Sequence, residues 1–336
     1  MNSVDFVHLQ CQSEYSVKNS LVRISNLIDS VKELGMQSVA LTDDMSLFSA
    51  IKFYQKAINA GIKPIIGAKI SLSYEEGHYD VLLLCQNHEG YLNLSELISK
   101  AYLNEQGISI VSVTEEQLIT HQKGLLMISS PASSDISKHL LSNNFEIAKK
   151  TALKWKSIFK DRYYMSVQRT ERPSDESLLN LIIDLGLEVE VPIVATNDVQ
   201  FIDQNDFEAH EARICIAEGG LLDDARRSKN FSSHQYLKTS EEMMLLFEDY
   251  PQVIENSSEI AKRCNLHFEL FEKNYLPLFP TPEGMSIADF FSQESKKGLE
   301  VRLKGLKVDK KIYIERLNFE LSVILEMDFP GYFLIV

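Results

Sequence analysis

The sequence predicts an α/β fold, either a (β/α) barrel or a closely wound sheet covered by helices. Short apolar runs alternate with amphipathic helical segments through most of the 336 residues. The apolar runs are rich in Val, Ile, Leu and Tyr, as strands buried on both faces are. Seven runs are predicted as strands: Phe6–Cys11, Ser38–Asp43, Pro64–Ser71, Asp80–Cys85, Leu125–Ser129, Tyr163–Gln168 and Ile193–Asp198. Strands that are each followed by helical material are typical of a barrel or a doubly covered sheet.

Start and stop signals define several of the helices. Residues 51–60 have an amphipathic pattern that stops at Gly61, a residue that favours the left-handed conformation at helix ends. Thr114 and Thr239 each precede a Gln or Glu by three residues, which is the pattern of a capping box. We therefore expect a helix to begin after each of these threonines.

The pattern changes after about residue 223. Residues 240–263 predict two helices that are broken near Pro251, because proline is tolerated only in the first turn of a helix. We expect these helices to extend the barrel, so that the first domain covers residues 1–270.

Residues 271–336 are predicted as a connector followed by the incomplete start of a second domain. A proline-rich stretch, Leu276–Pro282, precedes a strongly helical pattern from Ile287 onward. The last run, Gly331–Val336, is apolar and strand-like, and a bare strand is a poor natural end. We therefore expect the polypeptide to continue beyond Val336.

Composition excludes several classes of protein. Acidic residues outnumber basic ones 48 to 34, which gives a formal net charge of −14 and a pI near 5.1. A protein that mainly grips nucleic-acid backbone would carry a basic excess. The four cysteines are scattered without a Cys-x-x-Cys pair, which argues against a zinc finger. No signal peptide or membrane-spanning run is recognisable, so a cytoplasmic protein without membrane contact is predicted.

Polar residues at the ends of the predicted strands mark a candidate site. His8, Gln10 and Gln12 lie at the end of the first strand, Asp43 and Asp44 at the end of the second, and Asn197 and Asp198 at the end of the last. The active site of a barrel lies at such carboxyl ends.

Several motifs, taken together, resemble one family. They are Phe6–Ser16, Ala40–Asp43, Leu47–Tyr54, Gly61–Gly67, Gly90–Leu94, Gln168–Pro173, Val194–Val199, Ile260–Cys264 and Phe329–Val336. In this order and spacing they are similar to the polymerase and histidinol-phosphatase (PHP) domain of bacterial DNA polymerase III alpha subunits, running into the palm. The resemblance covers essentially the whole chain and implies a distorted seven-stranded barrel of the PHP type, followed by a mainly helical segment and a partial palm.

In family members with an intact site, His, Asp and Glu side chains at the strand ends hold a cluster of metal ions. Such metals lower the pKa of bound water and clamp phosphoryl oxygens, which permits phosphoester or 3′-end hydrolysis. Here His8, Asp43 and Asp198 match the family pattern. The other positions of the pocket depart from it: Gln10, Gln12, Asn19, Asp44, Lys69, Asp80, Ser166 and Gln200.

Two interpretations of this pocket remain. Lys69 stands where the family has a glutamate, and an ammonium there repels cations, so we predict a vestigial, metal-free pocket without catalytic residues. The alternative keeps a weak metal site made from His8, Asp43, Asp44, Asp80 and Asp198, with residual phosphoesterase or 3′–5′ exonuclease activity.

The resemblance also implies partners. The palm carboxylates that hold Mg²⁺ in this family would lie beyond Val336, so this chain alone is predicted not to polymerise DNA. The expected partners are the proofreading exonuclease (epsilon) subunit and the rest of the DNA polymerase III holoenzyme. Arg226, Arg227 and Lys229 form a basic loop that offers a weaker hypothesis of direct DNA contact.

Overall fold

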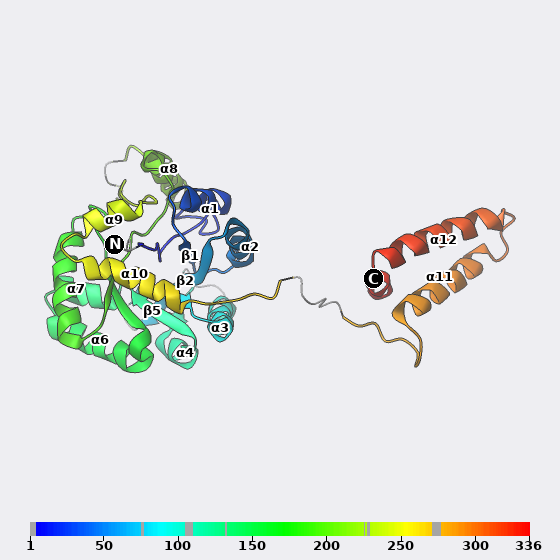
Figure 1. Cartoon of the computed structure of the whole chain (residues 1–336), viewed down its shortest axis with the longest axis horizontal. Helices are drawn as coiled ribbons and strands as arrows, with labels where there is room; N and C mark the ends of the chain where they lie inside the picture. Colours follow the sequence, from blue (N-terminus) through cyan, green and yellow to red (C-terminus); the bar gives the residue numbers. More distant parts are fainter. Residues whose placement is uncertain are drawn as a thin grey trace. The chain divides into compact units, whose positions relative to one another are not determined.

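The computed structural model describes residues 5–74, 77–104, 110–131, 133–224, 226, 229–270 and 277–336. The chain divides into two compact units, of which the first ends at Phe268 and the second begins at Glu269. The first unit contains every strand of the described chain, and Figure 1 shows its helices arranged around the outside of those strands.

The first unit is built on a curled, half-barrel sheet of seven strands, which confirms the predicted α/β fold class. The strands are β1 Ser38–Asp44, β2 Lys63–Tyr74, β3 Gly77–Cys85, β4 Val113–Thr114, β5 Leu125–Ser129, β6 Tyr163–Val167 and β7 Ile193–Ala195. They follow the order β1-β2-β3-β5-β6-β7, with β4 paired to β2 outside this path. Strand β3 is antiparallel to both of its neighbours, and the other pairs are parallel.

The first predicted strand, residues 6–11, is not a regular strand. It lies between β1 and the chain that follows β7, and its backbone bonds to both. The amide of Ala40 in β1 donates to the carbonyl of His8 (2.8 Å), and the amide of Val199 donates to the carbonyl of Gln10 (2.9 Å). These bonds are too sparse for a continuous ladder, so the strand prediction is wrong in form although the segment occupies the expected place. We call residues 8–12 the seam, because they join the two edges of the sheet.

The helices of the first unit connect and cover these strands. They are α1 Ile24–Glu33, α2 Ala50–Ala60, α3 His88–Asn104, α4 Glu115–Thr120, α5 Asp135–Leu141, α6 Phe145–Phe159, α7 Asp175–Val189, α8 Phe207–Glu218, α9 Ser240–Leu246 and α10 Pro251–Arg263. Short 3₁₀ turns occupy Lys160–Arg162 and Gln204–Asp206.

The local signals in the sequence set several of these ends. Gly61 follows α2 with a φ of 78°, a conformation that costs glycine little. Thr114 and Thr239 both form the predicted capping boxes, at the starts of α4 and α9. Pro251 occupies the first turn of α10, which confirms the predicted break.

One cluster of the hydrophobic core joins the sheet to α10 and includes Leu84, Val194 and Ile260. Helix α10 crosses the strands in Figure 1 and packs closely against β7. Asn256 of α10 donates its side-chain amide to the carbonyl of Ile193 (2.7 Å), and Ser257 accepts from the amide of Val7 (3.0 Å). Helix α10 therefore holds both β7 and the approach to the seam, which explains why the chain after residue 240 belongs to the barrel.

The second unit contains α11 Ile287–Leu303, α12 Lys310–Glu326 and α13 Pro330–Ile335. The side chains of Ser286 and Asp309 cap α11 and α12. The strand expected at Gly331–Val336 is wrong: the segment is helical, because Pro330 in the first turn sets a helical φ and the following residues continue the turn.

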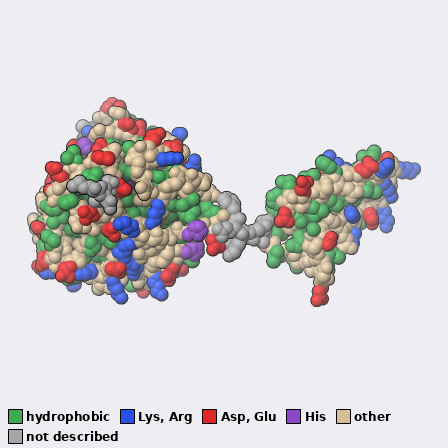
Figure 2. Space-filling model, in the orientation of Figure 1, with side chains coloured by type: hydrophobic (Ala, Val, Ile, Leu, Met, Phe, Trp, Pro, Cys, Tyr) green, Lys and Arg blue, Asp and Glu red, His purple; other side chains and the backbone are tan. Residues whose placement is uncertain are grey.

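Hydrophobic side chains gather on the visible face of the second unit (Figure 2), and Val301, Ile312 and Phe319 are among the exposed ones. Within the described ranges, none of the helices combines the length and apolar character needed to cross a bilayer.

Candidate functional site

The polar residues that the sequence places at strand ends gather at one end of the sheet. In the parallel register of β1 and β2, Asp44 lies opposite Lys69. In the antiparallel register of β2 and β3, Ser71 lies opposite Asp80. Asp44, Lys69 and Asp80 line one open cavity of about 600 Å³ together with Asn19. These four predicted site residues are therefore brought together.

Asp43 is buried beneath this cavity, with 1% of its surface exposed. Its carboxylate accepts hydrogen bonds from the amide of Ser13 (2.6 Å) and from the hydroxyls of Ser13 (2.9 Å), Ser16 (2.8 Å) and Ser49 (2.5 Å). A buried charge of this kind is stable only when its lone pairs are satisfied. These donors satisfy the lone pairs of both Asp43 oxygens.

Lys69 forms the centre of an ion-pair cluster at the mouth of the cavity. Its ammonium lies 3.6 Å from Asp44 and 3.7 Å from Asp80. Burial acts to lower the pKa of Lys69, but the charges of Asp44, Asp80 and Asp198 outweigh it and raise that pKa. Burial raises the pKa of the Asp44 carboxyl, against the opposing charge of Lys69. The lysine therefore supplies the positive charge that the two neighbouring carboxylates require.

Asp198 is surrounded by glutamine side chains. Its Oδ1 accepts from the amides of Gln10 (2.8 Å) and Gln200 (2.9 Å), and its Oδ2 accepts from Gln235 (2.9 Å). Gln168 donates in turn to the Oε1 of Gln10 (3.1 Å). The residue has a φ of 51°, a left-handed conformation that Asp tolerates better than most residues. Amide hydrogens therefore face the carboxylate from three directions.

His8 faces a buried lysine. The Nε2 of His8 donates to the carbonyl of Lys238 (2.8 Å), and the Nζ of Lys238 donates to the Oδ1 of Asn197 (3.1 Å). Burial lowers the pKa of His8 to about 4 and that of Lys238 to about 8. The Nδ1 of His8 has no hydrogen-bond partner in the described chain.

The remaining predicted positions do not complete a ligand set. The hydroxyl of Ser166 donates to the carbonyl of Ser129 (2.7 Å), so it is used within the sheet. The Oε1 atoms of Gln12 and Gln200 are buried, and neither has a hydrogen-bond partner among the residues that the structure describes. Amide oxygens are weak ligands for divalent metals compared with carboxylates or imidazoles.

The residues present do not fit the metal cluster that the family implies. Across the described residues, no group of three or more His, Cys, Asp or Glu side chains is arranged to hold a metal ion. Asp43 is committed to serine donors, Asp198 to glutamine amides, and Asp44 to Lys69. A divalent cation would have to displace these partners and would meet the ammonium of Lys69.

Sequence reasoning missed several residues that complete the pocket. Gln235 and Lys238 come from the chain beyond α8, and no local pattern connects them with Asp198 or His8. Ser13 and Ser16 lie inside the first motif, where two small polar residues after a buried run were a signal for a buried hydrogen-bonding role.

The basic loop is only partly described. Arg226 pairs with Asp224 at 3.0 Å, so part of its charge is neutralised locally. Arg227 lies outside the described residues, and the hypothesis of direct DNA contact through this loop stays a prediction.

Comparison with known proteins shows which family this chain is similar to. Residues 8–170 match the PHP domain family. The chain is 45% identical over 343 aligned residues to the DNA polymerase III subunit alpha of Pseudomonas fluorescens, covering 98% of this chain and 29% of that protein. It is 41% identical over 348 aligned residues to the DNA polymerase III subunit alpha of Escherichia coli (strain K12), covering 100% of this chain and 30% of that protein. The chain thus spans less than a third of the length of these relatives.

The solved structures that match this chain are more distant from it in sequence. An amidohydrolase from Chromobacterium violaceum aligns with a TM-score of 0.43 at 10% identity, over 62% of this chain and 96% of that one. A two-domain protein from Bacteroides vulgatus, containing a predicted PHP-like metal-dependent phosphoesterase, aligns with a TM-score of 0.32 at 14% identity, over 58% of this chain and 52% of that one.

Proposed function

Since residues 8–170 are a PHP domain and the whole chain is homologous to the N-terminal part of DNA polymerase III alpha subunits, we propose that it serves that polymerase as a metal-free scaffold. In this proposal the parent protein works in the cytoplasm and performs template-directed DNA synthesis with Mg²⁺ held by palm carboxylates outside this chain. The PHP domain itself stabilises the polymerase and receives the proofreading exonuclease subunit of the holoenzyme.

The observation that carries the proposal is the saturation of the pocket carboxylates. Asp43 accepts from serine donors, Asp198 from glutamine amides, and Asp44 and Asp80 share Lys69. A buried charged group is tolerated in a folded protein when it is paired. Removing its partner lowers the stability of the fold, because an uncompensated charge is left behind. The pocket therefore has the chemistry of a structural core rather than that of an open metal site.

Calorimetric titration tests the metal-free part of the proposal. The purified chain, treated with a chelator and dialysed, is titrated with Mn²⁺ and separately with Zn²⁺. We expect no saturable heat from micromolar to sub-millimolar metal, because no free cluster of ligands faces a cation. Saturable binding at one or more equivalents that disappears in Asp80→Asn would contradict the scaffold role.

The alternative function is a residual metal-dependent phosphoesterase or 3′–5′ exonuclease. It is favoured by the partial exposure of the Asp44 and Asp80 side chains, 36% and 24%, which leaves them within reach of solutes. Under this alternative Lys69→Glu should increase Mn²⁺ affinity, whereas Lys56→Glu, the same charge change on the exposed face of α2, should not. Equal titration curves for the two variants would remove the alternative.

Docking of the exonuclease subunit is tested separately. The acidic composition of the chain suits a protein partner with basic segments better than it suits DNA. We expect the purified exonuclease subunit to co-elute with this chain in size-exclusion chromatography. Independent elution at concentrations of tens of micromolar would refute docking and leave the metal-free interior unaffected.

A further inference from the structure

A largely apolar groove lies between the end of α7 and the start of α10, away from the pocket described above. It has a volume of about 790 Å³. Its lining residues come from α7, the loop after it and the start of α10, and they include Gly186, Leu187, Glu190, Tyr250, Val253 and Glu255. Leu187 is 75% exposed at the edge of the groove. A contiguous apolar concavity that is rimmed by polar residues is typical of a protein-binding site.

The floor of the groove is fixed by close packing. A Cβ on Gly186 would lie 2.5 Å from the Cδ1 of Ile193, so a larger residue at this position would force the Ile193 side chain to move. Val253 and Ile193 are buried beneath it, and Asn256 ties the start of α10 to β7. A groove on two anchored helices needs little reorganisation to receive a partner.

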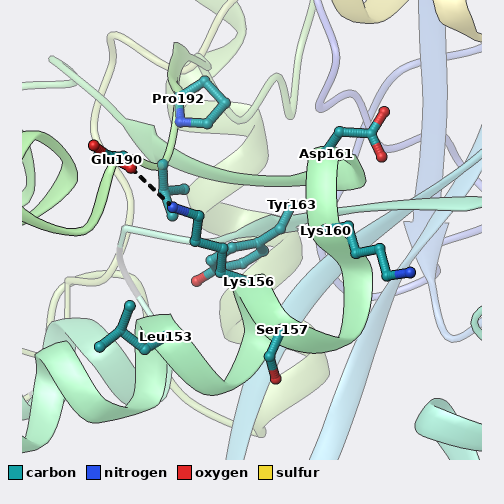
Figure 3. Close-up of a pocket in the computed structure, with 9 residues that line it drawn as sticks. Leu153, Lys156, Ser157, Lys160, Asp161, Tyr163, Glu190 and Pro192 are labelled. Carbon is teal, nitrogen blue, oxygen red and sulfur yellow. Dashed lines mark ion pairs between the residues drawn. The ribbon is translucent and has the colours of Figure 1, made fainter.

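The loop that follows α7 borders the groove and is bound by α6 on its opposite side. Glu190 has a φ of 53°, and Figure 3 shows Lys156 of α6 pointing toward it. The ammonium of Lys156 donates to the carbonyl of Val189 (2.9 Å) and lies 3.6 Å from the carboxylate of Glu190. A second cavity, of about 610 Å³, adjoins this loop and shares Pro192 with the groove. The concave surface therefore continues across the loop.

The charge of the groove has one sign. Among the described lining residues the ionisable acids are Glu190, Asp249 and Glu255, and none is a lysine or arginine. Asp249 is bound by Arg169 at 2.6 Å, and Glu190 lies 3.6 Å from the ammonium of Lys156. The Glu190 side chain is nevertheless 87% exposed, and Glu255 is also exposed. The start of α10 contributes a partial positive charge of only about half an elementary charge. The two exposed carboxylates therefore dominate.

We propose that this groove is a docking site for a short amphipathic segment of a partner protein, whose apolar side chains alternate with lysine or arginine. Its apolar side chains would pack on Leu187 and Tyr250, and its basic side chains would face Glu190 and Glu255. The inference goes beyond the proposed scaffold role, because it assigns a surface and a partner chemistry that do not depend on the interior pocket.

Fluorescence anisotropy tests the proposal on the full chain. The probe is a labelled peptide in which leucine alternates with lysine, as the proposal requires. A second peptide carries Glu in place of Lys. The apolar variant is Leu187→Ser, matched by Leu245→Ser, which removes an equally exposed leucine (71%) from α9. The charge variant combines Glu190→Lys with Glu255→Lys, matched by Glu146→Lys with Glu218→Lys.

We expect the leucine–lysine peptide to bind the wild type and both control variants alike. Leu187→Ser should weaken binding about ten-fold or more, the loss expected when one leucine contact is removed. The groove charge variant should lose the lysine peptide and gain the glutamate peptide.

Two results would overturn the proposal. One is the absence of lysine-peptide binding to the wild type, or equal binding by the groove variants and their controls. The other is a dimer, seen by sedimentation, that Leu187→Ser dissociates, because the occupant would then be a second copy of the chain. Metal titration of the interior is unaffected by either result, so the two proposals can fail independently.

Discussion

The two halves of the pocket neutralise their carboxylates by different chemistry. In the buried half, Asp43 and Asp198 are satisfied by hydroxyl and amide donors that carry no net charge. In the half that opens to solvent, Asp44 and Asp80 are satisfied by the full charge of Lys69. Uncharged donors at 2.5–3.0 Å fix a geometry, whereas ion pairs at 3.6–3.7 Å tolerate movement. We therefore expect the buried half to contribute more to stability than the half that opens to solvent.

The largest expected effect is at Asp43. Asp43→Asn replaces the buried carboxylate by an amide whose hydrogens face serine donors. We expect the free energy of unfolding to fall by about 3 kcal/mol or more, because several charge-assisted hydrogen bonds are lost together.

Urea denaturation measures this change, and Asp29→Asn on the exposed face of α1 is the matched control. If Asp43→Asn lowers the free energy of unfolding no more than Asp29→Asn does, the buried half does not contribute more to stability than the exposed half.

His8 belongs to the buried half and gives the next effect, which depends on pH. Burial lowers the folded-state pKa of His8 from its ordinary value of 6.5 to about 4. Its contribution to stability is therefore complete above pH 6.5 and is lost as the pH falls from 6.5 toward 4, by about 3 kcal/mol in total. His8→Gln, which stays neutral, should flatten that part of the stability profile.

Urea midpoints collected across this pH range provide the measurement. The exposed His88→Gln is the control and should keep the wild-type slope. An unchanged slope in His8→Gln would show that the imidazole is not buried in the neutral form.

The smallest effect is expected at the mouth of the pocket. Lys69→Met leaves Asp44 and Asp80 without their shared ammonium, and we expect a loss of about 1 kcal/mol at pH 7, since partly exposed ion pairs contribute little. The folded-state pKa of Lys69 is raised, so its contribution is present below its ordinary pKa and is lost as the pH rises through the raised value.

The free energies of unfolding of the wild type and Lys69→Met should therefore differ at neutral pH and converge at strongly alkaline pH, where Lys69 loses its charge. A loss at neutral pH that exceeds that of Asp43→Asn would reverse the ranking of the two halves.

The fold was predictable wherever a local signal sufficed. Gly61, Thr114 and Pro251 mark helix ends through backbone chemistry that acts within a few residues, and all three ends are confirmed. The final apolar run was misjudged because hydrophobicity alone does not separate a short strand from a short helix.

The pocket was predictable only in outline. The strand ends bring Asp44, Lys69 and Asp80 together because neighbouring strands share a register. Gln235 and Lys238 reach the pocket from a separate loop, and their contacts depend on how the whole chain folds back. Neither a hydrophobic periodicity nor a sequence motif predicts these long-range contacts.

The seam has a consequence for how the polypeptide folds as it leaves the ribosome. His8 can pair with Ala40 early, but Gln10 must wait for Val199, and the imidazole of His8 must wait for Lys238. At about 5–20 residues per second, the intervening chain takes roughly 10 to 40 seconds to synthesise. Residues 8–12 are therefore synthesised well before the segments that hold them, and they remain without these hydrogen-bond partners during that interval.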